Sequence, residues 1–262
     1  MDEYVVLGLT GGLRDSRVLI RRCKSLEELR DVFTGGERLA RRAARLRTSG
    51  RRVSKKRCEL YVFRRCKPGE DCLYLVSFDV KLVRVRDARR ARKGFRKPSH
   101  EYSEIKEMMY SRLCGSVDFS TYVCAEDRSA DVDRYLTEVA ASYHITRFYV
   151  RPLEDVDREL VRESIQKALD WVTARALTLA TRVANCAPQG YGIVRKKATE
   201  FLGALASVME SARRLEARLA RMGIEVPATR VVADAERYLR EAIQMREERS
   251  EKLKERRRSQ RR

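Results

Sequence analysis

The sequence contains few Gly and Pro residues, no long apolar stretch and none of the common enzyme motifs. Only 13 Gly and 5 Pro occur among 262 residues, which excludes collagen-like chains, linkers and all-β chains with many turns. No stretch approaches 18 consecutive apolar residues, so no transmembrane helix is predicted. The first residues lack the basic and apolar regions of a signal peptide. Walker A, G-x-G-x-x-G, H-E-x-x-H and G-x-S-x-G motifs are absent, and the sequence predicts no cofactor.

Positive charge is what the sequence has in excess. It holds 58 Lys and Arg against 38 Asp and Glu, a formal net charge of +20, and 45 of the basic residues are Arg. Hydrophobic residues make up 43%, which is enough for a buried core and excludes wholesale disorder. Asn185 is the single Asn. Scarce amides and dense charge are typical of a thermophile, although a GC-rich genome gives the same Arg bias.

Charge and periodicity both change near Pro152, which predicts two parts and a tail. Residues 1–151 mix strand and helix signals and form the predicted basic α+β module. Residues 152–250 are the predicted helical bundle. Residues 251–262 are a basic tail, expected to be frayed or disordered, because Leu253 is the single apolar residue after Met245. The predicted fold class is therefore α+β, followed by an antiparallel three-helix, coiled-coil-like bundle.

In the first part, local signals predict an alternation of strands and helices. Residues 58–65 and 72–86 read as a hairpin, because Lys67-Pro68-Gly69-Glu70-Asp71 between them is turn chemistry. A bulge or strand end is expected near residue 82. Residues 4–9 and 17–20 predict another hairpin, and residues 119–124 and 145–150 predict further strands. Helices are expected at residues 25–47, 103–114 and 131–142.

In the second part, apolar residues recur at spacings of four and three, the pattern of a heptad seam. The seam of the second helix stops before Gly223. Its predicted members are Val194, Ala198, Phe201, Leu205, Val208, Ala212, Leu215, Leu219 and Met222. The third helix repeats the spacing, with predicted core residues Val231, Ala235, Tyr238, Ala242 and Met245.

Three stretches concentrate the basic residues. The first basic cluster, residues 38–57, has ten basic residues and no acidic one, and the second, residues 81–97, has nine against Asp87. The third is the basic tail. On the predicted helix, Arg38, Arg41, Arg42 and Arg45 share one face. The candidate nucleic-acid-binding residues are these four with Arg51, Arg52, Lys55, Lys56, Arg57, Arg89, Arg90, Arg92, Lys93, Phe95, Arg96 and Lys97.

Like charges crowded in this way repel one another unless a partner neutralises them. A polyanion does so, because Arg binds phosphate with two parallel hydrogen bonds and Phe95 can stack on a base. We therefore expect a non-catalytic nucleic-acid-binding protein, DNA or RNA, of the architectural, packaging or accessory kind. No helix-turn-helix, zinc-finger or RNP pattern supports sequence-specific readout. The expected location is cytoplasmic, with a nucleoid or virion as the setting.

Seven cysteines without a secretion signal predict mainly reduced thiols, although thermophile cytosols do allow disulfides. Cys66 and Cys72 flank the predicted hairpin turn and form one candidate cross-strand disulfide. The default for Cys23, Cys114, Cys124 and Cys186 is a small buried hydrophobe. No C-x2-C pair occurs, and the sequence predicts no metal site.

Two other functions compete with the nucleic-acid-binding hypothesis. Asp79-Val80-Lys81 on a predicted strand, with Glu59 on the strand before, resembles the D…(D/E)-x-K arrangement of restriction-endonuclease-like nucleases. That resemblance implies a divalent metal held by Asp79 and Glu59, with Lys81 steadying the attacking water. The other alternative is a structural coiled-coil scaffold, in which the helical part mediates homo-oligomerisation and the charge is incidental.

Overall fold

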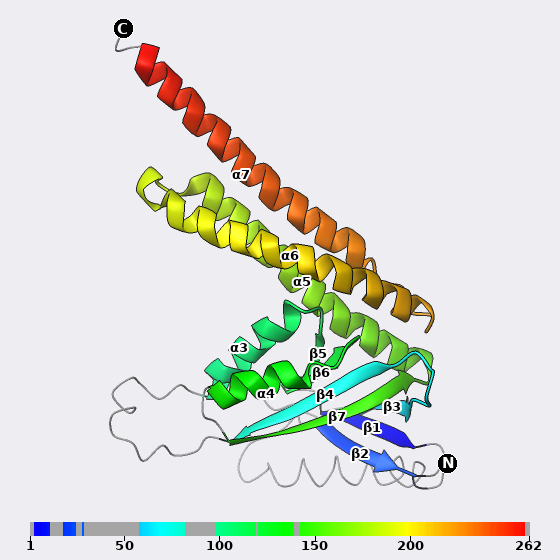
Figure 1. The fold of residues 1–262 in the computed structure, drawn as a ribbon. Helices are drawn as coiled ribbons and strands as arrows, with labels where there is room; N and C mark the ends of the chain where they lie inside the picture. Colours follow the sequence, from blue (N-terminus) through cyan, green and yellow to red (C-terminus); the bar gives the residue numbers. More distant parts are fainter. Residues whose placement is uncertain are drawn as a thin grey trace, which may run out of the picture.

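The computed structural model describes residues 3–10, 18–24, 28, 58–81, 98–118, 120–138 and 142–259. It is mixed α+β, as the sequence predicts: these residues form a curled antiparallel sheet and five α-helices (Figure 1). The strands are β1 (Tyr4–Thr10), β2 (Val18–Cys23), β3 (Cys58–Arg65), β4 (Leu73–Lys81), β5 (Gly115–Asp118), β6 (Thr121–Cys124) and β7 (Ser142–Pro152). The helices are α3 (Pro98–Tyr110), α4 (Ser129–Glu138), α5 (Asp155–Asn185), α6 (Tyr191–Ala220) and α7 (Ala228–Ser259), with a 3-10 turn at Pro188–Gly190.

The sheet has the strand order β2-β1-β3-β7-β4-β6-β5, and every neighbouring pair is antiparallel. The longest ladder joins β4 to β7, from Leu73 opposite Val150 to Lys81 opposite Ser142. β3 meets β7 along three residues only, from Phe63 to Arg65. The two halves of the sheet are therefore joined through a short contact at one end of β7.

Alternation along β4 divides its apolar side chains between two cores. Leu73 and Leu75 belong to a core with α5, α6 and α7, and Val76 and Phe78 belong to a core with α3 and α4. Successive side chains of a strand point to opposite faces, so helices cover both faces of this sheet at different places. The ladder with β7 is regular through Lys81, and the bulge expected near residue 82 lies outside the described residues.

The region around residue 120 differs from the sequence expectation. Instead of one strand at 119–124, a hairpin of β5 and β6 is present, with a register irregularity between Ser116 and Asp118. The turn lacks the Gly or Asn that marks most tight hairpins, which explains the missed strand. Gly115 packs against α5, because a Cβ there would lie 2.1 Å from the carbonyl carbon of Ser164. Glycine is therefore required for this close approach.

Helices α5, α6 and α7 pack on one another, and α5 also packs on the sheet. A single core runs from Val5 of β1 and Leu75 of β4 through Ile165 of α5 to Leu205 of α6 and Ala235 of α7. The strand-rich and helical parts predicted to meet near residue 151 thus share one hydrophobic core. The start of α5 is fixed by Asp157, whose carboxylate caps the helix at Glu154.

The apolar seam is as predicted on α6 but not on α7. On α6, the seam residues from Val194 to Met222 are buried, with Phe201 partly buried. On α7, Tyr238 is 45% and Met245 53% exposed, and the buried residues are instead Ala228, Val232, Ala235, Leu239 and Ala242. These positions have the same four–three spacing as the predicted ones, and both sets share Ala235 and Ala242. At two positions the buried residue is therefore the one that follows the predicted residue: Val232 instead of Val231, and Leu239 instead of Tyr238.

Candidate functional site

The predicted nucleic-acid-binding residues of both basic clusters lie outside the described residues. The first cluster falls entirely between β2 and β3. Of the second, Lys81 alone is described, as the last residue of β4. The first cluster is continuous in sequence with the start of β3 at Cys58, and the second with the end of β4. The candidate interface is therefore tethered to two strands of the sheet.

Charge is divided very unevenly between the described residues and the rest of the chain. The 198 described residues contain 35 basic and 32 acidic side chains, so they are almost neutral. The other 64 residues contain 23 basic and 6 acidic side chains, and hence most of the net charge of +20. With 58 basic residues and 38 acidic ones, at least 20 basic residues have no carboxylate of their own in this chain.

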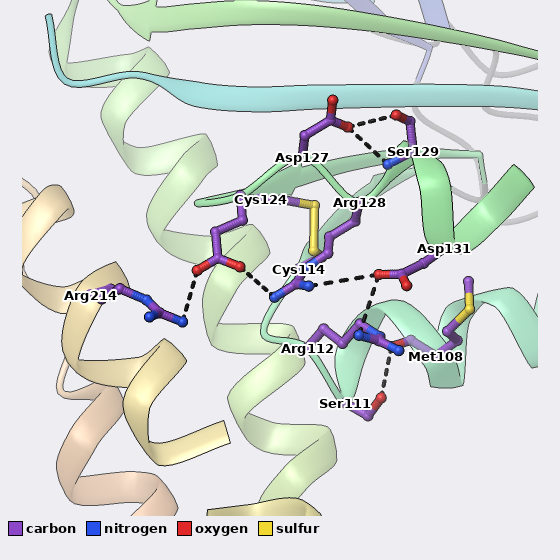
Figure 2. Close-up of polar contacts among 11 residues, drawn as sticks. Met108, Ser111, Arg112, Cys114, Cys124, Asp127, Arg128, Ser129, Asp131 and Arg214 are labelled. Atoms are coloured by element: carbon purple, nitrogen blue, oxygen red, sulfur yellow. Dashed lines mark hydrogen bonds and ion pairs between the residues drawn. A yellow bond between two sulfur atoms is a disulfide. The ribbon is translucent and has the colours of Figure 1, made fainter. Parts of the chain in front are cut away.

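Figure 2 shows a chain of ion pairs that contains three arginines and links α6, α4 and the turn after α3. Arg214 of α6 pairs with Glu126 at 3.0 Å, and Glu126 also accepts a hydrogen bond from Arg128 at 2.7 Å. Arg128 lies 3.7 Å from Asp131 of α4, and Asp131 lies 3.3 Å from Arg112 at the end of α3. Because positive and negative groups alternate along it, this network holds α6, α4 and the turn after α3 together.

Hydrogen bonds and an ion pair stabilise the ionised carboxylate of the neighbouring Asp127. The hydroxyl and the backbone N–H of Ser129 both donate to it, at 2.6 and 2.9 Å, and Arg147 of β7 pairs with it. Partial burial alone would raise the pKa of Asp127. The hydrogen bonds from Ser129 and the guanidinium of Arg147 outweigh it, and the pKa is lowered.

Two further arginines of α6 bind the two turns at the end of the sheet. Arg218 donates through the same nitrogen to the carbonyl oxygens of Cys72, at 3.2 Å, and of Ala125. Arg221 forms two hydrogen bonds with Asp71, at 2.5 and 2.8 Å, and this pairing lowers the pKa of Asp71. Each carbonyl belongs to a disulfide cysteine or to its neighbour. The sequence offered no signal for this contact, which joins residues about 90 to 150 positions apart.

A disulfide lies next to each of these two carbonyl groups. Cys66 and Cys72, the pair that flanks the predicted hairpin turn, are joined by a disulfide. A second disulfide joins Cys114 and Cys124, so the expectation that these two are unpaired buried hydrophobes is wrong, although both are buried. They lie next to the β5–β6 pair of Gly115 and Val123, with Cα atoms 4.4 Å apart, which the single predicted strand could not reveal. Cys23 is buried and Cys186 partly buried, both as free thiols.

The sheet does not bring the nuclease candidates together. β3 and β4 run parallel on either side of β7, with Arg65 and Leu73 both opposite Val150. Glu59 precedes this level by six residues and Asp79 follows it by six, so each lies roughly 20 Å from it in opposite directions. Asp79 is exposed, with His144 opposite it on β7. Among the described residues, no group of three or more His, Cys, Asp or Glu is placed to hold a metal.

Helix α7 includes the first part of the basic tail. Its last contacts with the other helices are a hydrogen bond from Arg246 to the carbonyl of Cys186 and an ion pair of Glu247 with Arg195 at 2.8 Å. The helix then continues to Ser259 beyond the ends of α5 and α6 (Figure 1). Lys252 and Arg256 are exposed on this extension, which is the described portion of the basic tail. Residues 251–259 of the predicted basic tail thus belong to α7, and their fraying stays a prediction.

No protein-family model, curated protein or solved structure matches this chain. Within the described part of the chain, none of the helices combines the length and the apolar character needed to cross a bilayer.

Proposed function

We propose that the protein is a non-catalytic nucleic-acid-binding protein that neutralises phosphates with its basic clusters and reads little base sequence. The observation that carries the proposal is the segregation of charge. The described residues are nearly balanced in charge, and many of their arginines pair with carboxylates of the same chain, as Arg214 does with Glu126. The excess of positive charge lies in residues 38–57 and 81–97. Asp87 is the single acidic residue in these two stretches, so they lack the carboxylates that would neutralise their basic side chains.

The test is the salt dependence of binding to a duplex DNA fragment. Each phosphate contact contributes about −0.9 to the slope of log K against log salt concentration. We expect a steep slope for the wild type and a shallower one when Arg38, Arg41, Arg42 and Arg45 are all replaced by Gln. A slope that is shallow, and equal for duplex DNA and a neutral polymer, would end the proposal. An unchanged slope in the variant would remove that segment from the site.

The structure offers a control variant with the same change of net charge. Four exposed arginines of α6 and α7 form ion pairs within their own helix. They are Arg213, Arg230, Arg237 and Arg240. Replacing these four by Gln removes four positive charges that already have carboxylate partners. The control should keep a slope close to that of the wild type, which separates a local contact from a general effect of net charge.

The helical part is proposed to form an antiparallel three-helix, coiled-coil-like bundle that also supports homo-oligomerisation. The exposed apolar residues Tyr238, Met245 and Leu253 on α7 favour this second role. Sedimentation should then show a dimer or larger species, and a monomer at all concentrations would contradict it. A cytoplasmic location, with a nucleoid or a virion as the setting, belongs to the same proposal. Two disulfides fit it if the cytosol is that of a thermophile.

A further inference from the structure

One face of the sheet presents two tyrosines side by side near the β3–β4 turn. Tyr74 of β4 and Tyr149 of β7 are directly opposite in the ladder, with ring centroids 4.8 Å apart and planes tilted by 56°. Tyr149 is 38% exposed, and Tyr74 is partly buried. Helices α3 and α4 cover the neighbouring side chains of Val76 and Phe78 but leave this pair at the surface.

Arginines border the tyrosine pair on the same face. Side chains of β7 alternate between the two faces, so Arg147, Tyr149 and Arg151 share one face, with an arginine on either side of the ring. Arg64 of β3 is directly opposite Arg151. The side chain of Arg147 remains 53% exposed although it pairs with Asp127. Three guanidinium groups on two strands thus surround the aromatic pair.

The carboxylates around the pair already have partners. Glu70 accepts two hydrogen bonds from Arg64, at 2.7 and 2.9 Å, and this contact lowers the pKa of Glu70. Asp71 and Asp127 are paired in the same way, with Arg221 and Arg147 respectively. Arg151 belongs to none of these three pairs. The negative groups at this surface are therefore balanced, and a guanidinium is left beside the rings.

A lone exposed tyrosine on a strand is ordinary, because aromatic residues favour sheets. A tyrosine pair with one ring exposed and the other partly buried, and with arginines before and after it on β7, is a more specific arrangement. Bases of a single strand stack on aromatic side chains while adjacent cations hold the phosphates. A duplex hides its base faces and offers nothing for the rings to stack on. The arrangement therefore favours an unpaired strand over a duplex.

We propose that Tyr74 and Tyr149, with Arg147 and Arg151, form a platform on which a single-stranded nucleic acid stacks its bases. The inference rests on the proposed function and deepens it. The basic clusters supply charge that is indifferent to the form of the nucleic acid, and the platform supplies a preference for exposed bases. Because every base has a face to stack, binding at the platform requires no particular sequence.

The test compares single strands with and without bases. Fluorescence anisotropy is measured with oligothymidylate, with oligouridylate and with an abasic strand of the same length and charge. Tyr149→Leu keeps apolar bulk beside Tyr74 but removes the ring, and we expect it to weaken binding to the base-bearing strands about tenfold. Binding to the abasic strand should not change. Tyr149→Phe keeps the ring and should bind like the wild type, which also checks that the fold tolerates a change there.

Leu177→Ala is the control, because Leu177 is comparably exposed, at 46%, but lies on α5, away from the tyrosine pair. It should bind every strand like the wild type. Equal affinity for oligothymidylate and oligouridylate would show that the platform accepts both DNA and RNA. Unequal affinity would identify the preferred nucleic acid. If the wild type binds base-bearing and abasic strands equally and Tyr149→Leu changes neither, the platform is refuted while the proposed function stands. If the wild type binds none of the strands nor duplex DNA, the proposed function fails as well.

Discussion

The carboxylate of Asp157 accepts a hydrogen bond at 2.9 Å from the backbone N–H of Val62, a residue 95 positions earlier in the chain. Its other oxygen accepts the backbone N–H of Glu154 at 3.0 Å and so caps α5. Asp157 is 2% exposed. One buried side chain therefore fixes the start of the first long helix against strand β3, and it couples the orientation of the helices to the sheet.

We predict that Asp157→Ala lowers the free energy of unfolding by about 1–3 kcal/mol, because two buried backbone N–H groups lose their acceptor. Asp157→Asn keeps an acceptor oxygen and should cost less. Burial raises the pKa of Asp157 above its usual 3.8, and the backbone hydrogen bonds offset only part of this. Between pH 3.8 and the raised pKa, the folded state binds more protons than the unfolded state. The free energy of unfolding therefore falls as the pH rises through this interval.

Urea denaturation over a series of pH values measures this contribution. In Asp157→Asn, the free energy of unfolding should no longer fall between pH 3.8 and the raised pKa of Asp157. Asp127→Asn should show the opposite sign, because the lowered pKa of Asp127 adds stability above 3.8 that is lost as pH falls. The same pH dependence in Asp157→Asn and the wild type would show that burial does not perturb Asp157 in this way.

Gly115→Ala is expected to destabilise the protein by at least about 2 kcal/mol. The new methyl group would lie 2.1 Å from backbone atoms of Ser164 and 2.4 Å from the nitrogen of Ile165, and backbone in a helix interior cannot move aside. Gly203→Ala is the control, since nothing lies within 4 Å of a Cβ at that helical position. It should stabilise by about 0.5–1 kcal/mol. Equal effects of the two variants in thermal unfolding would contradict the close approach of β5 to α5.

Local signals were sufficient for part of the fold and insufficient elsewhere for identifiable reasons. The turn residues Pro68 and Gly69 correctly marked the break between β3 and β4, and Gly69 has the positive φ of 85° that such a turn uses. The predicted hairpin is nevertheless wrong, because β7 lies between β3 and β4 and the two strands run parallel. On α7, two overlapping stripes have the same spacing, and only packing against α5 and α6 selects the one with Leu239. The ion pairs of Arg214, Arg218 and Arg221 join residues that are distant in sequence, so no local pattern predicts them.

The phase of α7 can be tested with two neighbouring substitutions. Leu239 is fully buried, so Leu239→Ala should reduce the free energy of unfolding by about 2–5 kcal/mol through the cavity it leaves. Tyr238 is 45% exposed, and Tyr238→Ala should cost less than about 1 kcal/mol. Chemical denaturation of both variants measures the difference. The heptad phase deduced from sequence requires the reverse order, and finding it would overturn the packing described for this helix.

Reduction of the disulfides should weaken the docking of α6 on the sheet. Replacing Cys66 and Cys72 together by Ser is expected to cost about 2–3 kcal/mol, the chain-entropy value for so short a loop. Arg218→Met removes the donor to the carbonyls of Cys72 and Ala125. The hydrogen bond from Arg218 to the carbonyl of Cys72 depends on the turn that the disulfide closes. The losses in free energy of unfolding caused by the two changes should therefore not be additive. In a double-mutant cycle we expect the combined loss to fall short of the sum by about 0.5–3 kcal/mol.

Arg237→Met provides the reference for this cycle, because Arg237 pairs with Asp234 within α7 at 2.8 Å and does not contact either turn. Its effect should add to that of the cysteine replacement within about 0.5 kcal/mol. Addition of dithiothreitol to the wild type reduces Cys114–Cys124 as well, so it should lower the temperature of thermal unfolding at least as much as the cysteine replacement does. If Arg218→Met and the cysteine replacement are strictly additive, α6 docks independently of the disulfide, and the turn serves only to connect β3 with β4.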